Sequence, residues 1–218
     1  MTEAATRLAQ IRERIAGAAK AAKRNAAEVV LVAVTKQRSV AEIEPLISAG
    51  VTDFRENRVA EASDKWAGIR QAHPGIRLHM IGQLQSKKAQ DAVRLFDVIH
   101  SLDRPSLLDA LVKAAAAADR FPDVFVQVNI GGEEQKGGIP IEELSGFLDK
   151  VRASPLPLAG LMAMPPLDQQ PAPYFALLAD LARRHDVGGL SMGMSSDYEA
   201  AVMLGATAVR IGSALFSD

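Results

Sequence analysis

Eight short apolar runs recur along the 218 residues, and each is followed by a longer segment with helical spacing of its apolar residues. Two neighbouring parallel strands need a crossover connection, so this alternation predicts a parallel sheet covered by helices. Eight such units in one chain indicate closure into a (β/α)8 barrel, a fold for which this length is near the short end. The runs occupy residues 28–36, 51–57, 77–84, 96–102, 123–130, 157–164, 188–194 and 207–213.

Helices are expected between these runs, and an extra helix is expected before the first of them. The N-terminal helix can begin after the cap Thr2 and places five apolar residues on one face: Ala4, Leu8, Ile11, Ile15 and Ala18. The other helices are expected over 40–49, 57–70, 86–95, 104–119, 140–153, 170–185 and 196–204, with caps that include Ser39, Asp103 and Ser196.

A doubly wound open sheet is the competing architecture. No Gly-x-Gly-x-x-Gly turn follows the first strand, so the dinucleotide-binding version of that fold lacks its phosphate turn. The nearest thing to a linker, residues 165–173, is short enough to be a loop, and no internal repeat is visible. We therefore expect one domain over residues 1–218.

Composition narrows the classes of function. The 25 basic and 26 acidic residues are spread along the chain, whereas a nucleic-acid partner would need a concentrated basic face. The absence of cysteine excludes disulfides and thiolate ligands, and the four histidines lack the spacing of metal ligands, so no metal is expected. The sequence contains neither a secretory signal nor the roughly 20 apolar residues of a membrane span, which predicts a cytoplasmic protein.

Polar residues gather where the predicted strands end, which is where barrels of this type carry their function. Lys36 ends the most apolar strand, and it either extends into solvent or reaches the barrel mouth as a desolvated amine that can form an imine. After the last two strands, Ser195, Gly212 and Ser213 can donate hydrogen bonds to a phosphate, with Gly212 and Ser213 opening a final helix. Ordinary strand-to-helix turns rich in glycine and serine are the alternative.

Seven segments of the chain resemble the pyridoxal phosphate homeostasis proteins, whose fold type III barrel is shared with bacterial alanine racemases. The segments are AVTK (33–36), F-x-ENRVAEA (54–62), HMIGQLQSKK (79–88), VNIGGEEQKGGI (128–139), GLMAMPP (160–166), LSMGMSSDYEAAV (190–202) and VRIGSALF (209–216). They occur in this order over nearly the whole chain. The resemblance implies that the chain binds pyridoxal 5′-phosphate (PLP) and acts in its intracellular homeostasis.

The resemblance also implies a role for each matching position. Lys36 would carry the cofactor as a Schiff base, and Arg210 would face its pyridine nitrogen. The other positions would form the phosphate cradle (Ser195, Gly212 and Ser213) and the pocket walls or backbone (Asn57, Ser191, Met194 and Ile211), with His79 behind them.

The rim of this pocket departs from the family pattern. Arg55 stands where glycine is usual, Lys87 stands where asparagine is common, and the chain ends at FSD without the usual glycine. The loop over 131–138 is expected to be a solvated charged loop, although a lid that offers Lys136 as a second attachment point is the alternative. The departures at Arg55, Lys87 and the end of the chain leave Lys36 and the phosphate turns unchanged.

Arg210 has a consequence for catalysis. A permanent cation opposite the pyridine nitrogen keeps that nitrogen unprotonated, which makes the cofactor a weaker electron sink. The related racemases add a tyrosine base from an extra domain, whereas Tyr174 and Tyr198 are expected to pack or to lie on the surface. The resemblance therefore implies a carrier that supplies PLP-requiring apoenzymes with little or no catalysis. A monomer is expected, since no separate dimerisation segment is visible. A small racemase that uses Lys36, or an aldolase that forms substrate imines there, remains an alternative.

Overall fold

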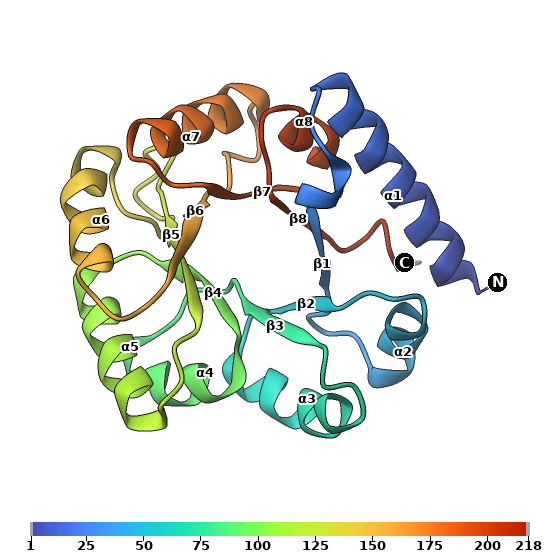
Figure 1. Ribbon diagram of the computed structural model, residues 1–218, viewed down its shortest axis with the longest axis horizontal. Coiled ribbons are helices and arrows are strands. Elements are labelled where there is room, and N and C mark those ends of the chain that lie inside the picture. Colours follow the sequence, from blue (N-terminus) through green and yellow to red (C-terminus); the bar gives the residue numbers. More distant parts are fainter. Residues whose placement is uncertain (1, 217–218) are drawn as a thin grey trace.

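The computed structural model describes residues 2–216. Eight parallel strands form a closed barrel in sequence order, because β1 pairs with both β2 and β8 (Figure 1). Closure confirms the predicted barrel and excludes the open doubly wound sheet. The strands are β1 (Val30–Val34), β2 (Asp53–Glu56), β3 (Arg77–Met80), β4 (Val98–Leu102), β5 (Asp123–Gln127), β6 (Leu158–Met162), β7 (Gly189–Met194) and β8 (Ala208–Ile211).

Among residues 2–216, eight α-helices surround the barrel (Figure 1). They are α1 (Glu3–Ala21), α2 (Val40–Ser48), α3 (Val59–Ala72), α4 (Ala89–Leu95), α5 (Pro105–Ala118), α6 (Leu144–Arg152), α7 (Ala172–Arg184) and α8 (Tyr198–Met203). Short 3₁₀ helices precede β1, α4 and α6: η1 (Ala26–Glu28), η2 (Ser86–Lys88) and η3 (Ile141–Glu143). None of these described helices is long and apolar enough to span a membrane.

The N-terminal helix completes the outer ring of helices. Within the described residues no helix follows β8, and α1 packs between α8 and α2 in the place that such a helix would take (Figure 1). Gly212 therefore does not open a final helix as expected; residues 212–216 form a turn closed by a hydrogen bond from Leu215 N–H to Gly212 O. Arg7 of α1 donates to the Leu215 carbonyl, so the docked helix occupies the space and holds the turn.

Two predicted helix caps are confirmed. The Thr2 side chain accepts a hydrogen bond from Ala5 N–H at the start of α1. Ser39 and Glu42 form a reciprocal capping box at the start of α2, which satisfies backbone donors that the helix itself leaves free.

Two other helices begin one residue later than expected. The N-cap of α5 is Arg104, not Asp103, because Pro105 needs no hydrogen-bond partner for its nitrogen and suits the first helical position. The N-cap of α8 is Asp197, not Ser196, and its carboxylate accepts from Met194 N–H at the end of β7.

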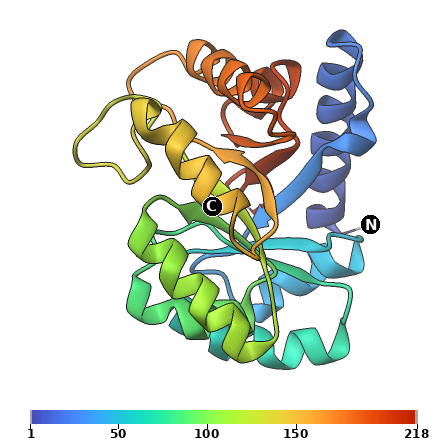
Figure 2. The same ribbon diagram turned by 60° about the vertical axis from the view of Figure 1, so that its left-hand side comes forward.

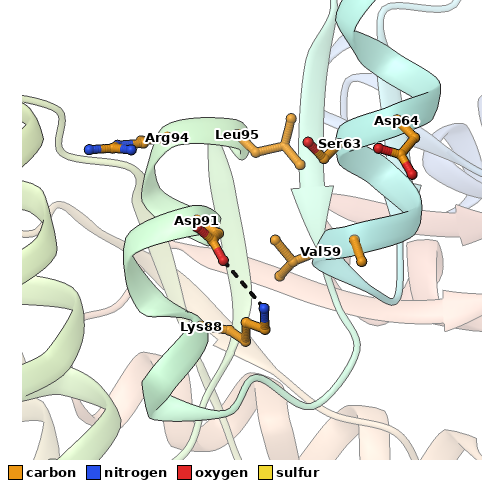
Figure 3. Close-up of a pocket in the computed structure, with 8 residues that line it drawn as sticks. Val59, Ser63, Asp64, Lys88, Asp91, Arg94 and Leu95 are labelled. Atoms are coloured by element: carbon orange, nitrogen blue, oxygen red, sulfur yellow. Dashed lines mark hydrogen bonds and ion pairs between the residues drawn. The ribbon is translucent and has the colours of Figure 1, made fainter.

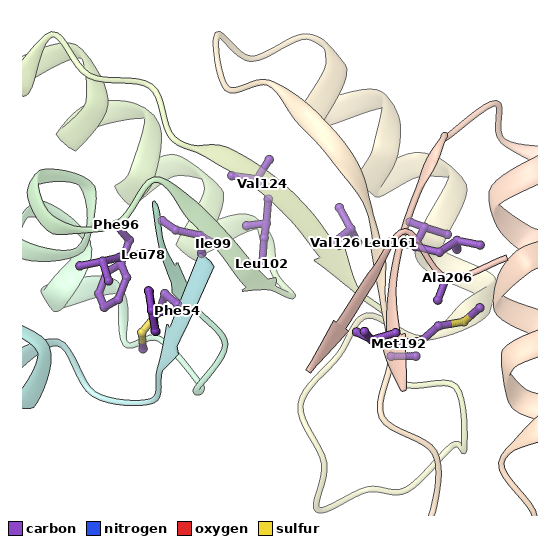
Figure 4. Close-up of a cluster of buried hydrophobic side chains, with 14 of the residues drawn as sticks. Phe54, Leu78, Phe96, Ile99, Leu102, Val124, Val126, Leu161, Met192 and Ala206 are labelled. Carbon is purple, nitrogen blue, oxygen red and sulfur yellow. The ribbon is translucent and has the colours of Figure 1, made fainter. Parts of the chain in front are cut away.

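The core has two layers, because successive strand residues point to opposite sides of the barrel wall. Outward side chains such as Phe54, Leu78 and Ile99 join the apolar faces of the helices in one large buried cluster (Figure 4). The single tryptophan of the chain, Trp66, is fully buried there. A smaller cluster that includes Phe125 packs separately from it. The inward positions also include polar side chains, and these position the site.

Candidate functional site

A cavity of about 580 Å³, here called the mouth cavity, lies at the carboxyl ends of β1, β7 and β8. Its volume is within the usual range of small-ligand sites. The lining residues are Val34, Lys36, Arg55, Met194, Ser195, Ser196, Arg210, Gly212, Ser213 and Ala214. The structure therefore brings together six of the nine predicted site residues in one cavity.

The other three predicted residues adjoin this lining. Asn57 Oδ1 accepts a hydrogen bond from Arg55 Nη2 at 3.0 Å, and Ser191 Oγ accepts from Arg210 Nη1 at 2.8 Å. Ile211 is buried in the cluster between strands and helices, because it follows the inward-facing Arg210 on β8. Ile211 can therefore offer only its backbone to the cavity.

The turns after β7 and β8 meet at a hydrogen bond from Gly212 N–H to Ser195 Oγ, at 3.1 Å. A Cβ at position 212 would lie 3.2 Å from Val34 Cβ, so glycine allows the β8 turn to pack closely on β1. Ser195 and Ser213 add hydroxyl groups, and no acidic side chain is among the described lining residues. Hydroxyl and backbone donors without a neighbouring carboxylate suit a phosphate ester.

Arg210 is buried below these turns. Its Nη1 donates to Ser191 Oγ and its Nη2 donates to Ala163 O at 3.1 Å, whereas its buried Nε has no partner. Burial and then the charge of Arg55 lower the pKa of Arg210 to about 9, so the side chain is still charged at neutral pH. The geometry leaves one buried cationic donor available to an acceptor in the cavity.

Lys36 lines the cavity together with Ser195, Gly212 and Ser213. The side chain thus lies at the mouth of the barrel beside both glycine–serine turns. The sequence left two possibilities open for Lys36, a solvent-exposed lysine or a desolvated amine in the barrel mouth. The structure combines the exposure of the first with the location of the second, because Lys36 follows the end of β1 and lines the mouth cavity.

Two side chains of α3, Lys65 and Glu61, hold the residues on both sides of Lys36. We call these two residues the clamp. Lys65 Nζ donates to Thr35 O at 2.8 Å and to Glu56 Oε1 at 2.9 Å. Gln37 N–H donates to Glu61 Oε1 at 2.7 Å, and this bond is the largest cause of a lowered pKa of the Glu61 carboxyl. The clamp fixes the backbone that carries Lys36.

A line of hydrogen bonds crosses the barrel interior below the mouth cavity. Ser191 Oγ contacts His100 Nδ1, His100 Nε2 contacts His79 Nδ1, and His79 Nε2 contacts Asp53 Oδ1, each at 2.9 Å. All four residues are buried, and the His100 ring stacks on Phe125 with 4.4 Å between centroids. We call Asp53, His79, His100 and Ser191 the interior chain.

The charge state at the two ends of the interior chain differs. Burial opposes ionisation of Asp53, but hydrogen bonds from His79 and Thr52 outweigh it and hold the pKa of Asp53 below its ordinary value. The carboxylate only accepts, so His79 Nε2 carries a hydrogen. Burial, and after it the neighbouring His79, lowers the pKa of His100 well below its ordinary value, so this ring stays neutral.

A second cavity, of about 570 Å³, lies on the outer ring between α3 and α4 (Figure 3). Its lining includes the ion pair of Lys88 with Asp91, whose Nζ and Oδ2 atoms are 3.5 Å apart, but none of the nine predicted site residues. Across residues 2–216, no group of three or more acidic or histidine side chains could hold a metal ion. The mouth cavity, and not this outer cavity, therefore coincides with the predicted chemistry.

The loop after β5 projects beyond the barrel wall (Figure 2). Lys136 Nζ forms an ion pair with Glu133 at 2.6 Å and donates to Pro165 O at 3.2 Å. Lys136 is not among the residues that line the mouth cavity. In this structure the loop is a charged, partly buried segment joined to the β6–α7 connection.

Sequence reasoning missed the clamp residues Lys65 and Glu61 and the inward position of Arg55. Lys65 and Glu61 are four residues apart on α3, and that spacing could have indicated an ion pair, but not that both reach the β1 loop. Arg55 alternates with the outward-facing Phe54 and Glu56, so strand period alone could have placed it inside the barrel.

Comparisons with known proteins show the family to which the chain belongs. The family model for the N-terminal domain of alanine racemase matches residues 6–218. A pyridoxal phosphate homeostasis protein of Pseudomonas aeruginosa is 39% identical, over 99% of this chain and 96% of its own length. That of Deinococcus radiodurans is 42% identical, over 96% of this chain and 97% of its own.

Solved structures give the same result. PipY of Synechococcus elongatus with PLP bound is 33% identical, with a TM-score of 0.85 over 99% of this chain and 100% of its own. A Clostridium difficile alanine racemase is 15% identical, with a TM-score of 0.69, and shares the fold alone. The chain is thus a barrel of the alanine racemase N-terminal domain class. Within that class it belongs to the family of pyridoxal phosphate homeostasis proteins, as its sequence predicts.

Proposed function

We propose that this protein binds PLP in the mouth cavity and acts as an intracellular carrier of the cofactor. The observation that carries the proposal is the combination of Lys36, the two glycine–serine turns and the unpartnered Nε of Arg210 around one cavity. The donor set fits PLP, because an amine, a phosphate cradle and a donor for a ring nitrogen are all present. The curated relatives are named for PLP homeostasis, and PipY holds PLP in its solved structure.

Each residue would have a distinct task. Lys36 Nζ would attach to the aldehyde carbon, while Ser195 and the backbone at Gly212 and Ser213 would hold the phosphate, with the Gly212 N–H exchanging Ser195 Oγ for a phosphate oxygen. Arg210 Nε would donate to the ring nitrogen, with Ser191 fixing the guanidinium from behind. The remaining contributions would be those of the wall and backbone positions Asn57, Met194 and Ile211.

The same residues argue against efficient turnover. When bound, PLP supplies an electrophilic carbon and an electron-withdrawing ring, but a cation at the ring nitrogen keeps that nitrogen unprotonated and limits the electron withdrawal. No tyrosine is among the residues described as lining the cavity, so the second base of a racemase has no counterpart there. Binding and release of PLP therefore account for the site better than racemisation.

A titration with PLP tests the proposal. The visible absorbance of lysine-bound PLP should appear with the native protein and be lost in Lys36→Ala, while the control Lys113→Ala on the exposed face of α5 should behave as the native protein does. Ser195→Ala and Ser213→Ala should each weaken PLP binding about tenfold to a hundredfold, since a charged acceptor loses one donor. Unchanged binding in both serine variants would show that the phosphate lies elsewhere.

Two alternatives have their own signatures. Rapid exchange of the α-hydrogen of L-alanine in deuterated buffer, with accumulation of the D-isomer, would support a racemase. An aldolase that uses Lys36 directly would remain colourless when mixed with PLP.

The carrier role extends to partners and location. We expect a cytoplasmic monomer that transfers PLP to PLP-requiring apoenzymes. Sedimentation analysis of the loaded protein tests the monomer, and recovery of activity by an apoenzyme mixed with it tests the transfer.

A further inference from the structure

Arg55 is a cation for which the proposed binding mode provides no anionic partner. It lies on β2 next to Val34 of β1, and its side chain points into the barrel mouth because Phe54 and Glu56 face the helices. Only 9% of Arg55 is exposed. Its Nη2 donates to Asn57 Oδ1, an uncharged acceptor, and its buried Nε has no partner.

The charge balance of the mouth cavity is one-sided. Lys36, Arg55 and Arg210 line it, and none of the described lining residues is acidic. The partly buried cation Lys65, by contrast, forms ion pairs with Glu56 and Glu61. A buried charge is costly unless it is paired, so two guanidinium groups without a carboxylate indicate that an anionic group belongs in this cavity.

The substitution pattern of the PLP ring would place one such group beside Arg55. In PLP the phosphate arm and the ring oxygen flank the aldehyde carbon on opposite sides. In the proposed binding mode Ser195 and Gly212 would hold the phosphate from β7 and β8, and Lys36 would attach from β1. The ring oxygen would then face the other neighbour of β1, which is β2, the strand that carries Arg55.

We propose that Arg55 forms an oxyanion subsite on the β2 side of the mouth cavity, distinct from the phosphate turns. The subsite takes a negatively charged oxygen. This oxygen belongs either to the ring of PLP or to the carboxylate of an amino acid that reaches the loaded site. A guanidinium at this position favours the deprotonated ring oxygen, because an opposite charge stabilises the anion. This inference rests on the proposed function, since the other cavity residues must hold PLP first.

The first arm of the test compares PLP with its analogue that lacks the ring oxygen, 3-deoxypyridoxal 5′-phosphate. The native protein should bind PLP about tenfold or more tightly than the analogue, because a charged hydrogen bond is lost. Arg55→Met should abolish most of this preference by weakening PLP binding alone, and Arg55→Lys should keep part of it. The pH at which the bound ring oxygen titrates should rise in Arg55→Met by about one unit.

The second arm identifies the source of the anion. Propionate, a carboxylate without an amine, is added to PLP-loaded protein while the Arg55 Nε–H resonance is followed by NMR. A shift that is absent with propionamide assigns the subsite to a carboxylate, and no shift together with a positive first arm assigns it to the ring oxygen.

The outcomes separate the two proposals. If the native protein binds neither PLP nor its analogue, the proposed function fails. If both bind but Arg55→Met weakens them equally or not at all, and propionate causes no shift, only the oxyanion subsite is overturned. Urea unfolding of ligand-free Arg55→Met ensures that a weakened variant is still folded.

Discussion

The interior chain and the mouth cavity are both polar regions of one barrel, yet their hydrogen bonding differs. Each polar atom between Asp53 and Ser191 has a partner, with four contacts in line from Arg210 to the carboxylate. In the mouth cavity, Arg55 Nε and Arg210 Nε are buried and lack partners. Native proteins pair nearly all buried polar groups. Of these two regions, the mouth cavity with its unpaired arginine nitrogens is therefore the one arranged for a ligand.

The two regions should contribute differently to the stability of the ligand-free protein. The interior chain satisfies itself and should contribute to stability whether or not PLP is present. The cations of the mouth cavity are held in place by neutral groups and should cost stability until an anion arrives. Substitutions in the interior chain should therefore destabilise the ligand-free protein far more than substitutions in the mouth cavity.

The largest effect is expected for His100→Ala. This change leaves His79 Nδ1 and Ser191 without their partner and opens a cavity against Phe125, so the free energy of unfolding should fall by about 2–4 kcal/mol. Urea denaturation of the ligand-free protein measures it, with His185→Ala at the end of α7 as the control. A loss no larger than that of the control would break the contrast between the two regions.

The pH dependence of stability should come next. His100 has a lowered pKa in the folded protein, so as the pH falls below about 6.5 the unfolded chain takes up a proton that the folded protein does not. The free energy of unfolding should fall with a slope that approaches about 1.4 kcal/mol per pH unit. Denaturation of native protein and His100→Gln between pH 5 and 7 checks this, and equal slopes in the two proteins would contradict it.

A smaller effect on stability is expected in the mouth cavity. Arg55→Met replaces an unpaired buried charge with an apolar side chain of similar length, so ligand-free stability should stay within about 1 kcal/mol of native or rise. Urea denaturation without PLP measures it. A loss comparable to that of His100→Ala would show that Arg55 is a structural residue after all.

The smallest effect is expected in the clamp. Glu61→Gln weakens the bond to Gln37 N–H without touching the cavity, so amide exchange at Gln37 should speed up about threefold to tenfold. Hydrogen–deuterium exchange measures this, with an amide of α5 as internal reference. Unchanged exchange would mean that the Lys36 loop is held by other contacts.

The sequence predicted the barrel because its signal is local and repeated. Each strand needs only a short apolar run and each helix only a periodic face, and all eight runs contain the observed strands. The missing final helix could not be foreseen, because residues 212–216 are capable of a helical turn. The outcome there depends on α1, which docks from the other end of the chain.

The site was predictable in position but not in hydrogen bonding. The rule that function collects at strand ends brought Lys36, Ser195 and Gly212 together. The interior chain joins β2, β3, β4 and β7, so its members are up to 91 residues apart between contacting partners, and no short-range pattern reveals such contacts. The solvation of Lys36 also depends on the shape of the cavity rather than on the strand that precedes it.

The attachment of PLP to Lys36 is the central claim, and covalent labelling tests it directly. PLP-loaded protein is reduced with borohydride, digested, and mapped by mass spectrometry. The predicted result is one added pyridoxyl phosphate group on the peptide that contains Lys36, and none in protein that was not loaded. A modification confined to Lys136 or to surface lysines, with Lys36 unmodified, would contradict the central claim.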